Sequence, residues 1–193
     1  MIIIVVSTVL AITACPALGA GKHSKGRRGT HGAAVCANAN TPASSARRTA
    51  LKAAVVCLID RQRAAHGLPA LSEDSRLDRS AQIWTDTMAT TKQFDHGEDF
   101  AARITAAGYV WSSAGENIAT GFATPQQVVS AWMESPGHCR NILDPDYRSV
   151  GTGVVDRPIP GFSSAPATWT QDFALPIGAP APSSDWGPAD SVC

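Results

Sequence analysis

The segment VVSAWMESPGHCRNIL, residues Val128–Leu143, constrains the fold more than any other part of this 193-residue chain. Val129 and Trp132 recur at the spacing of one apolar helix face, which predicts a buried helix. Ser135-Pro136-Gly137 should redirect the chain, because proline disrupts the interior of a helix. His138 follows directly. The segment therefore predicts a core helix that ends where a titratable ring is presented.

Apolar periodicity predicts the remaining elements. Helical spacing indicates helices over residues 46–66, from a cap at Ser72 to before Phe94, over about 100–107, and from the Thr124-Pro125 pair onward. Ser44 or Ser45 could cap the first of them. Alternation predicts strands at 149–155 and 168–173, which are antiparallel if the break between them is a hairpin loop. Two strands are too few for a sheet covered by these helices, so at least one further strand is expected, around 114–119. Helices on both sides of these strands indicate an α+β fold, a three-layer α-β-α sandwich with a central antiparallel sheet.

The first 20 residues have the character of an export signal. Residues 1–14 are almost entirely apolar but too short to span a bilayer as a helix, which needs roughly 20 residues. The sequence Ile12-Thr13-Ala14-Cys15 also resembles a bacterial lipobox, which makes Cys15 a candidate lipidation site. An incidental cysteine in a signal peptide is the alternative. Either interpretation predicts a secreted protein, with attachment to the cell envelope, and so contact with a membrane, only if Cys15 carries a lipid.

Charge divides the chain into a basic arm and an acidic body. Residues 1–59 hold seven of the sixteen Lys and Arg residues and no acid, so the rest of this formally neutral chain is acidic. We interpret residues 21–45 as a basic flexible linker, residues 46–176 as the folded domain and residues 177–193 as an irregular tail. The arm could instead dock on an anionic wall or membrane surface.

Four cysteines besides Cys15 predict disulfide bonds in an exported chain. They can pair in three ways, and spacing alone does not decide among them. The pairs Cys36–Cys57 and Cys139–Cys193 are favoured, because the first would fasten the arm to the first helix and the second would fasten the tail.

Four side chains offer the atoms that a divalent metal site needs, and all four are expected in loops or at the ends of elements. They are His96, Glu116, Glu134 and His138. No pair has HExxH spacing. Structural alternatives are a helix-end hydrogen bond for His138 and a loop carboxylate satisfied by backbone amides for Glu116.

Other chemistry is disfavoured by the sequence. Cys139 lies beside His138, but a disulfide-bonded cysteine cannot act as a nucleophile. The sequence has no GxSxG elbow, phosphate-binding loop, dinucleotide fingerprint or CxxC pair. The acidic body has no aromatic stripe interleaved with Lys or Arg, so nucleic acid is not an expected partner.

Five motifs occur in an order that resembles a known family. They are Phe94-Asp95-His96, Gly115-Glu116-Asn117-Ile118-Ala119, the stretch from Ala131 to Leu143, Gly151-Thr152-Gly153-Val154-Val155, and Thr170-Gln171-Asp172-Phe173. Together they resemble the bacterial branch of the CAP superfamily. That superfamily includes cysteine-rich secretory proteins, antigen-five allergens and plant pathogenesis-related proteins, and its domain is also called SCP. The resemblance covers residues 46–175.

The resemblance implies a cleft in which two histidines and two glutamates hold a divalent ion such as zinc. His96, Glu116 and His138 match three of these positions. The fourth position falls on Ser135 here, and Glu134 lies one residue earlier, which turns its side chain about 100° around a helix. Glu134 is therefore a doubtful fourth member.

The resemblance does not imply a single activity, since family members are linked to sterol or lipid binding, protein interaction and proteolysis. We consider three hypotheses. The first is a non-enzymatic module whose cleft binds a metal and a lipid or cell-wall ligand. The second is a metal-dependent hydrolase with Glu116 as general base, and in the third the polar cluster only locks the fold.

Overall fold

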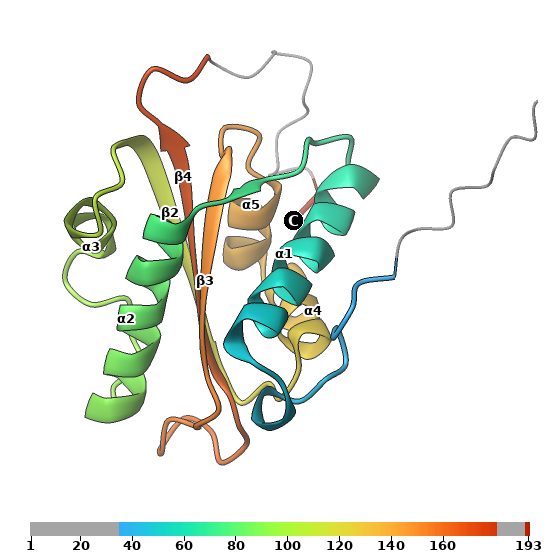
Figure 1. Ribbon diagram of the computed structural model, residues 1–193, viewed down its shortest axis with the longest axis vertical. Helices are drawn as coiled ribbons and strands as arrows, with labels where there is room; N and C mark the ends of the chain where they lie inside the picture. The colour runs from blue at the N-terminus through green and yellow to red at the C-terminus, as the bar shows by residue number, and fades with distance from the viewer. Residues whose placement is uncertain (1–34, 181–191) are drawn as a thin grey trace, which may run out of the picture. The chain divides into compact units, whose positions relative to one another are not determined.

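A four-stranded sheet in the order β1-β3-β4-β2 forms the centre of the computed structural model, which describes residues 35–180 and 192–193 (Figure 1). The strands are β1 (Ser72–Glu73), β2 (Trp111–Thr120), β3 (Ser149–Val155) and β4 (Thr168–Pro176). The three long strands are antiparallel, as predicted, and β3 and β4 form the expected hairpin. Only β1 runs parallel to its neighbour, so the sheet is mixed at that edge. The predicted signal segment and Cys15 lie outside the described residues.

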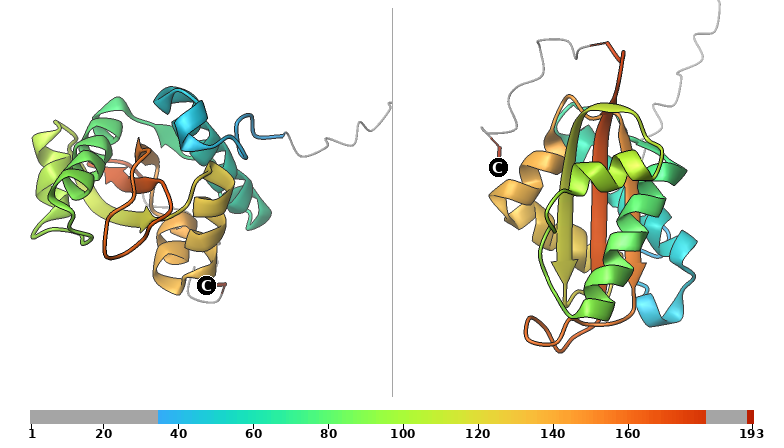
Figure 2. Two further views of the ribbon diagram at one scale, coloured as in Figure 1. Left: turned by 90° about the horizontal axis from the view of Figure 1, so that it is seen from below. Right: turned by 90° about the vertical axis from the view of Figure 1, so that its left-hand side faces the viewer.

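Helices cover both faces of the sheet, which confirms the three-layer arrangement (Figures 1 and 2). Helices α2 and α3 lie on one face, and α1, α4 and α5 lie on the other. Among the residues that the structure describes, no helix is long and apolar enough to cross a membrane. The helices are η1 (Ala43–Ser45), α1 (Arg48–Ala65), α2 (Ser75–Thr91), α3 (Phe100–Ala106), α4 (Pro125–Glu134) and α5 (Pro136–Leu143).

Two helix starts differ from the prediction. The N-cap of α1 is Arg47, whose side chain makes no capping bond, because the serines expected there belong to η1. The N-cap of α2 is Asp74, whose carboxylate accepts a 2.8 Å hydrogen bond from the Arg76 amide. Ser72 is instead part of β1, a strand too short to leave an alternation pattern in the sequence.

The last part of the predicted linker belongs to the folded domain. The Ala43 amide donates to the Ala123 carbonyl, and the Gln126 amide donates to the Ala39 carbonyl, each at 2.8 Å. Cys36 is buried and bonded to Cys57 in α1, with 5.7 Å between the two Cα atoms. Residues 36–45 are therefore packed against the domain rather than free of it.

A second disulfide joins Cys139 in α5 to Cys193, so the two bonds are the pairings favoured from the sequence. Cys139 is consequently unable to act as a nucleophile. The bond also fastens the last residue of the chain to the helix that carries His138.

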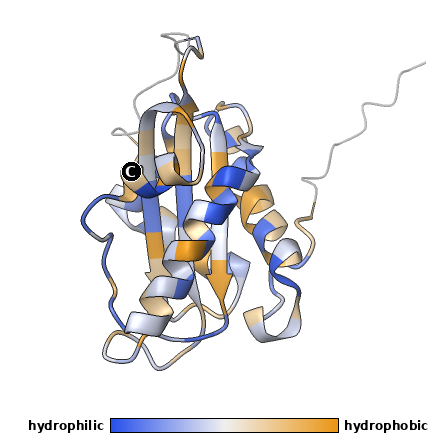
Figure 3. Ribbon diagram, turned by 60° about the vertical axis from the view of Figure 1, so that its left-hand side comes forward, coloured by the Kyte–Doolittle hydropathy of each residue, from blue (hydrophilic) through white to orange (hydrophobic). Residues whose placement is uncertain are grey.

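The two faces of the sheet differ in chemistry. The face toward α1, α4 and α5 includes Trp169 and Phe173 in the largest hydrophobic cluster, with a buried polar row of Asn117, Gln171 and Thr152 between them. The face toward α2 carries Glu116 and its cross-strand neighbour Asp172, both buried. Figure 3 shows hydrophilic bands in the middle of the sheet, where a buried strand is usually apolar.

Helix α2 lies close to the sheet because β3 presents glycines to it. A Cβ atom on Gly151 would overlap the backbone of Leu77 and Asp78, and one on Gly153 would overlap the backbone of Ala81. Glycine is thus required at both positions for the helix to approach this closely. The short distance brings α2 near the buried acids.

The break predicted in the Val128–Leu143 segment is present, but it separates two helices. Thr124 and Gln127 form a capping box at the start of α4, and Ser135 adopts an extended conformation after its last turn. Pro136 then begins α5, which suits the fixed φ angle of proline. His138 therefore lies in the first turn of a second helix, not in a loop.

Side chains of α4 and α5 satisfy the outer carbonyls of β2, the edge strand. The Trp132 indole donates to the Ile118 carbonyl at 3.3 Å, and the Asn141 amide donates to the Glu116 carbonyl at 3.1 Å. Asn141 also donates to the Asn117 side chain at 2.8 Å. These bonds hold the α4–α5 pair beside the edge of the sheet.

Arg63, a fully buried cation, fastens the end of α1 to the end of α5. Its guanidinium donates at 2.8 Å to each of the carbonyls of Pro69, Ile142 and Asp144. Burial lowers the pKa of Arg63 to about 10. The group remains charged at neutral pH and is stabilised by carbonyl dipoles.

We expect Gly151→Ala to destabilise the fold by about 1–3 kcal/mol or more, because the added methyl would push α2 away from the sheet. Gly137→Ala in α5 is the matched control, since nothing lies within 4 Å of its added Cβ. The control should be neutral or stabilising by up to about 1 kcal/mol. Urea unfolding measures both changes, and equal effects would contradict this account of the α2 contact.

Candidate functional site

His96 lies in the segment between α2 and α3 and is fixed by the local backbone. The Asp95 carboxylate accepts a 2.8 Å hydrogen bond from the Gly97 amide, and Gly97 adopts a positive φ of 67°. This turn points the imidazole toward β2, with Nδ1 2.8 Å from Oε1 of Glu116. The ring is about half exposed, while the Glu116 side chain is 1% exposed.

Glu116 lies in the middle of β2, which confirms the strand expected around residues 114–119, whereas the expectation that Glu116 occupies a loop or an element end is wrong. Its second oxygen, Oε2, accepts a hydrogen bond from the guanidinium of Arg103 in α3, at 2.5 Å. The two carboxylate oxygens are therefore each engaged by a different donor. A buried carboxylate needs such partners, because an unpaired charge in the interior is strongly unfavourable.

Arg103 is the centre of a small network that sequence analysis missed. Its guanidinium lies 3.9 Å from the centre of the Trp84 ring and donates to the His96 carbonyl at 2.9 Å. Trp84 in turn donates to the Asp95 carbonyl at 3.0 Å. The network joins α2, α3, β2 and the His96 segment, so the positions of His96 and Glu116 depend on one another.

Asp172 on β4 is the direct cross-strand partner of Glu116. Burial raises the pKa of Asp172 well above its usual range, and the nearby charge of Glu116 raises it further. Among the described residues, neither carboxyl oxygen of Asp172 has a well-aligned hydrogen-bond partner, although Ser80 is a close polar neighbour. The environment therefore favours the protonated form of Asp172.

His138 approaches the site from the other layer, on α5. Burial lowers the pKa of His138, and positive charge on His96 lowers it further. The His138 carbonyl accepts a 3.2 Å hydrogen bond from the Asn117 side chain, which fixes this turn of α5 to β2. His138 is thus held near His96 and favours the neutral imidazole.

An apolar pocket of about 240 Å³ lies beside His138, and we call it the β2 pocket. Apolar side chains form most of its wall, with His138, Ser135 and Thr120 as its polar members. The complete lining is Phe94, Ile118, Ala119, Thr120, Phe122, Ala131, Trp132, Ser135 and His138. Strand β2, helix α4 and the segment before His96 therefore enclose it together.

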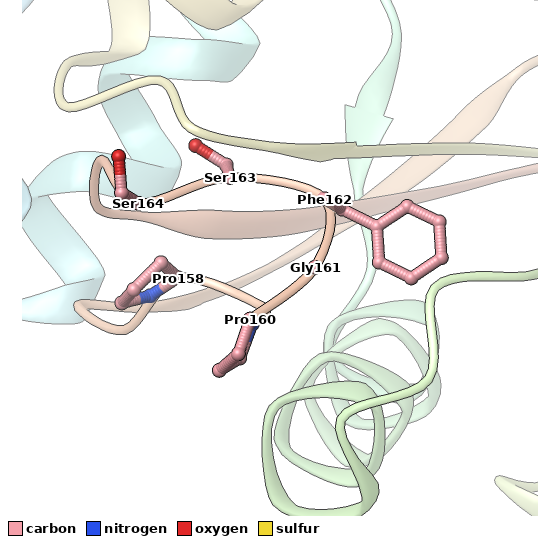
Figure 4. Close-up of a pocket in the computed structure, with 6 residues that line it drawn as sticks. All are labelled: Pro158, Pro160, Gly161, Phe162, Ser163 and Ser164. Carbon is pink, nitrogen blue, oxygen red and sulfur yellow. The ribbon is translucent and has the colours of Figure 1, made fainter.

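The loop between β3 and β4 packs against Phe94 in the wall of this pocket. Figure 4 shows the Phe162 ring projecting away from Ser164, and the ring centre lies 5.4 Å from that of Phe94. A hollow of about 520 Å³ is lined by Pro158 and residues 160–164 of the loop itself. No titratable side chain lines that hollow, whereas His138 lines the β2 pocket, so we place the candidate site at the β2 pocket rather than in the loop.

Glu134 is not brought to the histidines. It ends α4 and borders a separate hollow of about 410 Å³, together with Gly121, Gln126 and Ser130. This placement agrees with the rotation expected from its offset in the sequence. The site unites His96 with Glu116 directly and His138 nearby.

The residues do not fit a divalent ion as they are arranged. Across residues 35–180 and 192–193, no three His, Cys, Asp or Glu side chains converge closely enough to hold a metal. Arg103 already supplies a positive charge to Glu116. The zinc site implied by the resemblance therefore stays a prediction.

The sequence did contain a signal for Asp172, a buried acid that the sequence analysis did not single out. Asp172 interrupts the predicted strand Thr168–Phe173, and a carboxyl group in a central strand must find a partner or accept a proton. Arg103 left no such signal, because its partner Glu116 lies thirteen residues away in another layer.

The fold is that of the CAP domain. The sequence profile of the Cysteine-rich secretory protein family, CAP, matches residues 56–173, so the chain is a member of that family.

Two curated relatives come from Bacillus subtilis. The uncharacterized protein YkwD is 37% identical over 124 residues, which cover 62% of this chain and 45% of YkwD. The uncharacterized membrane protein YlbC is 29% identical over 96 residues, which cover 48% of this chain and 28% of YlbC. The chain thus spans less than half the length of each.

Solved structures show the same fold. An extracellular protein of Bacillus anthracis that contains an SCP domain matches with a TM-score of 0.58 and 22% identity, over 67% of this chain and 44% of that one. An outer surface protein of Borrelia burgdorferi matches with a TM-score of 0.55 and 19% identity, over 63% of this chain and 90% of that one.

The raised pKa of Asp172 predicts a pH-dependent effect of Asp172→Asn. The unfolded carboxyl loses its proton near pH ~3.9, whereas the folded one keeps it to higher pH. Stability of the wild type therefore falls as pH rises from about 4 through the folded pKa, by up to about 1.4 kcal/mol per pH unit. The amide of the variant does not titrate, so its advantage should grow over this range.

Urea unfolding between pH 4 and pH 8 measures this difference. Asp156→Asn, at an exposed carboxyl just after β3, controls for the loss of one negative charge. A difference between Asp172→Asn and wild type that does not change with pH would contradict a raised pKa at Asp172.

Proposed function

We propose that this protein is an exported, non-enzymatic CAP module that binds an apolar group of a lipid or cell-envelope molecule in the β2 pocket. The observation that carries the proposal is the pocket itself. Its wall consists mostly of apolar side chains. His138, whose environment favours the neutral imidazole, is one of its few polar groups. Ligand sites are commonly apolar clefts with a few fixed polar groups.

The volume of the β2 pocket limits the size of the group that it can bind. Its volume of about 240 Å³ is below the range of roughly 300–1,000 Å³ that holds a whole small molecule. A part of a larger ligand, such as a segment of an acyl chain, suits it better. The remainder of that ligand would extend past His138 toward His96, whose ring is about half exposed.

Several observations support export. Two disulfides are formed, and such bonds persist in oxidising compartments. The apolar start of the sequence has the character of a signal peptide. The structural relatives include a protein described as extracellular and another described as an outer surface protein.

Hydrolysis is less well supported. A general base must reach a water molecule, and the Glu116 side chain is 1% exposed with each of its oxygens already hydrogen-bonded, one to His96 and the other to Arg103. No nucleophilic side chain is activated by a neighbouring base among the residues that form this site. The proposed role is therefore binding rather than turnover.

Filling the pocket should weaken binding. We expect Ala131→Leu to lower the affinity for a dansyl-labelled fatty acid about tenfold, because the added carbons occupy space in the pocket, and a tenfold change corresponds to about 1.4 kcal/mol. Ala64→Leu, at an exposed position on α1, adds the same group elsewhere and should leave the affinity unchanged. Fluorescence titration measures both.

Solubilised cell-wall fragments, added as competitors of the fatty acid, test the second ligand source. Displacement of the probe would favour a wall ligand at the same site. If wild type binds neither the probe nor wall fragments, or if Ala131→Leu binds as wild type does, the proposed function is wrong.

A further inference from the structure

The Glu116 carboxylate lies between an imidazole and a guanidinium. His96 Nδ1 is 2.8 Å from Oε1, and the Arg103 guanidinium is 2.5 Å from Oε2. His96 and Arg103, which lie in different segments of the chain, thus both contact the buried Glu116 carboxylate. Arg103 carries a permanent charge, since guanidinium groups stay protonated in proteins.

Arg103 is held in place from several sides besides Glu116. The Trp84 ring covers one face of its guanidinium at 3.9 Å, and the His96 carbonyl accepts from it at 2.9 Å. The backbone at Gly97 also lies close, because a Cβ there would be 2.8 Å from Trp84 and 3.1 Å from Arg103. The Arg103 side chain is only 18% exposed. Arg103 is therefore an integral part of the site rather than a surface residue that contacts it transiently.

A divalent ion bound by His96, Glu116 and His138 would share Glu116 with this cation. The ion would be repelled by the guanidinium and would gain less from a carboxylate whose charge is already paired. We infer that Arg103 is the resident cation of the cleft and takes the place of a metal ion, holding Glu116 and His96 as a fixed pair. This inference does not depend on the ligand of the β2 pocket.

Metal titration of the untagged full chain tests the inference with Zn²⁺ and Co²⁺ alone as probes. The wild type should bind no more metal than the His96→Ala/His138→Ala variant, which accounts for adventitious binding at other histidines. Arg103→Gln removes the charge but keeps a planar amide that can lie on Trp84. This variant should bind Co²⁺ at least about tenfold more tightly than wild type.

Further substitutions separate a metal gain from a general loosening of the fold. Glu116→Gln in the Arg103→Gln background should abolish the gained affinity and the Co²⁺ absorption bands. Arg76→Ala is the matched control, because Arg76 also pairs with a carboxylate and lies 4.7 Å from an aromatic ring, that of Tyr109. It should gain no metal affinity.

Two results would overturn the inference. The first is metal binding by wild type that is lost in the His96→Ala/His138→Ala variant. The second is a folded Arg103→Gln protein, verified by circular dichroism, that gains no metal affinity. If Arg103→Gln does not fold, the wild-type comparison still decides, because binding dependent on the two histidines contradicts a resident guanidinium.

Discussion

A carboxylate in the interior of a sheet is stable only when positive charge and hydrogen-bond donors reach it, and Glu116 sets that requirement here. Arg103 and His96 meet it from outside the sheet. The segment that links α2 to α3 must therefore fold so that both side chains converge on β2. The turn at Gly97 and the stacking of Arg103 on Trp84 follow from the same need. Electrostatics thus shapes a part of the chain that has little apolar core of its own.

Strand β2 connects the two helical layers because its successive side chains point to opposite faces. Glu116 faces α2 and α3, where Arg103 lies, and Asn117 is bonded to Asn141 of α5 on the other face. The His138 segment is fastened to the same strand through Asn117. The β2 pocket beside this strand is therefore lined by Phe94 on one side and by Trp132 and His138 of the α4–α5 pair on the other. This explains how two histidines more than forty residues apart in the sequence come close enough for the charge of His96 to lower the pKa of His138.

Local patterns predicted much of this fold because they reflect local physics. The break at Ser135–Gly137 follows from the chemistry of proline, and the hairpin of β3 and β4 follows from alternation. The sequence around Glu116 indicates both a strand and a loop, because a glycine and two polar residues imitate a loop, whereas the strand is defined by pairing with β4. Arg103 was missed because its partner lies across a layer boundary. Contacts between layers depend on how helices pack, and spacing in one sequence does not encode that.

The hydrogen bonds to the outer carbonyls of β2 also affect how copies of the protein associate at high concentration. An uncovered edge strand is a template on which a second chain can add. The Trp132 indole and the Asn141 amide occupy the carbonyls of Ile118 and Glu116 that such a strand would use. The same two side chains that position α4 and α5 therefore also discourage edge-to-edge association. Selection on either residue would act on solubility as well as on the shape of the cleft.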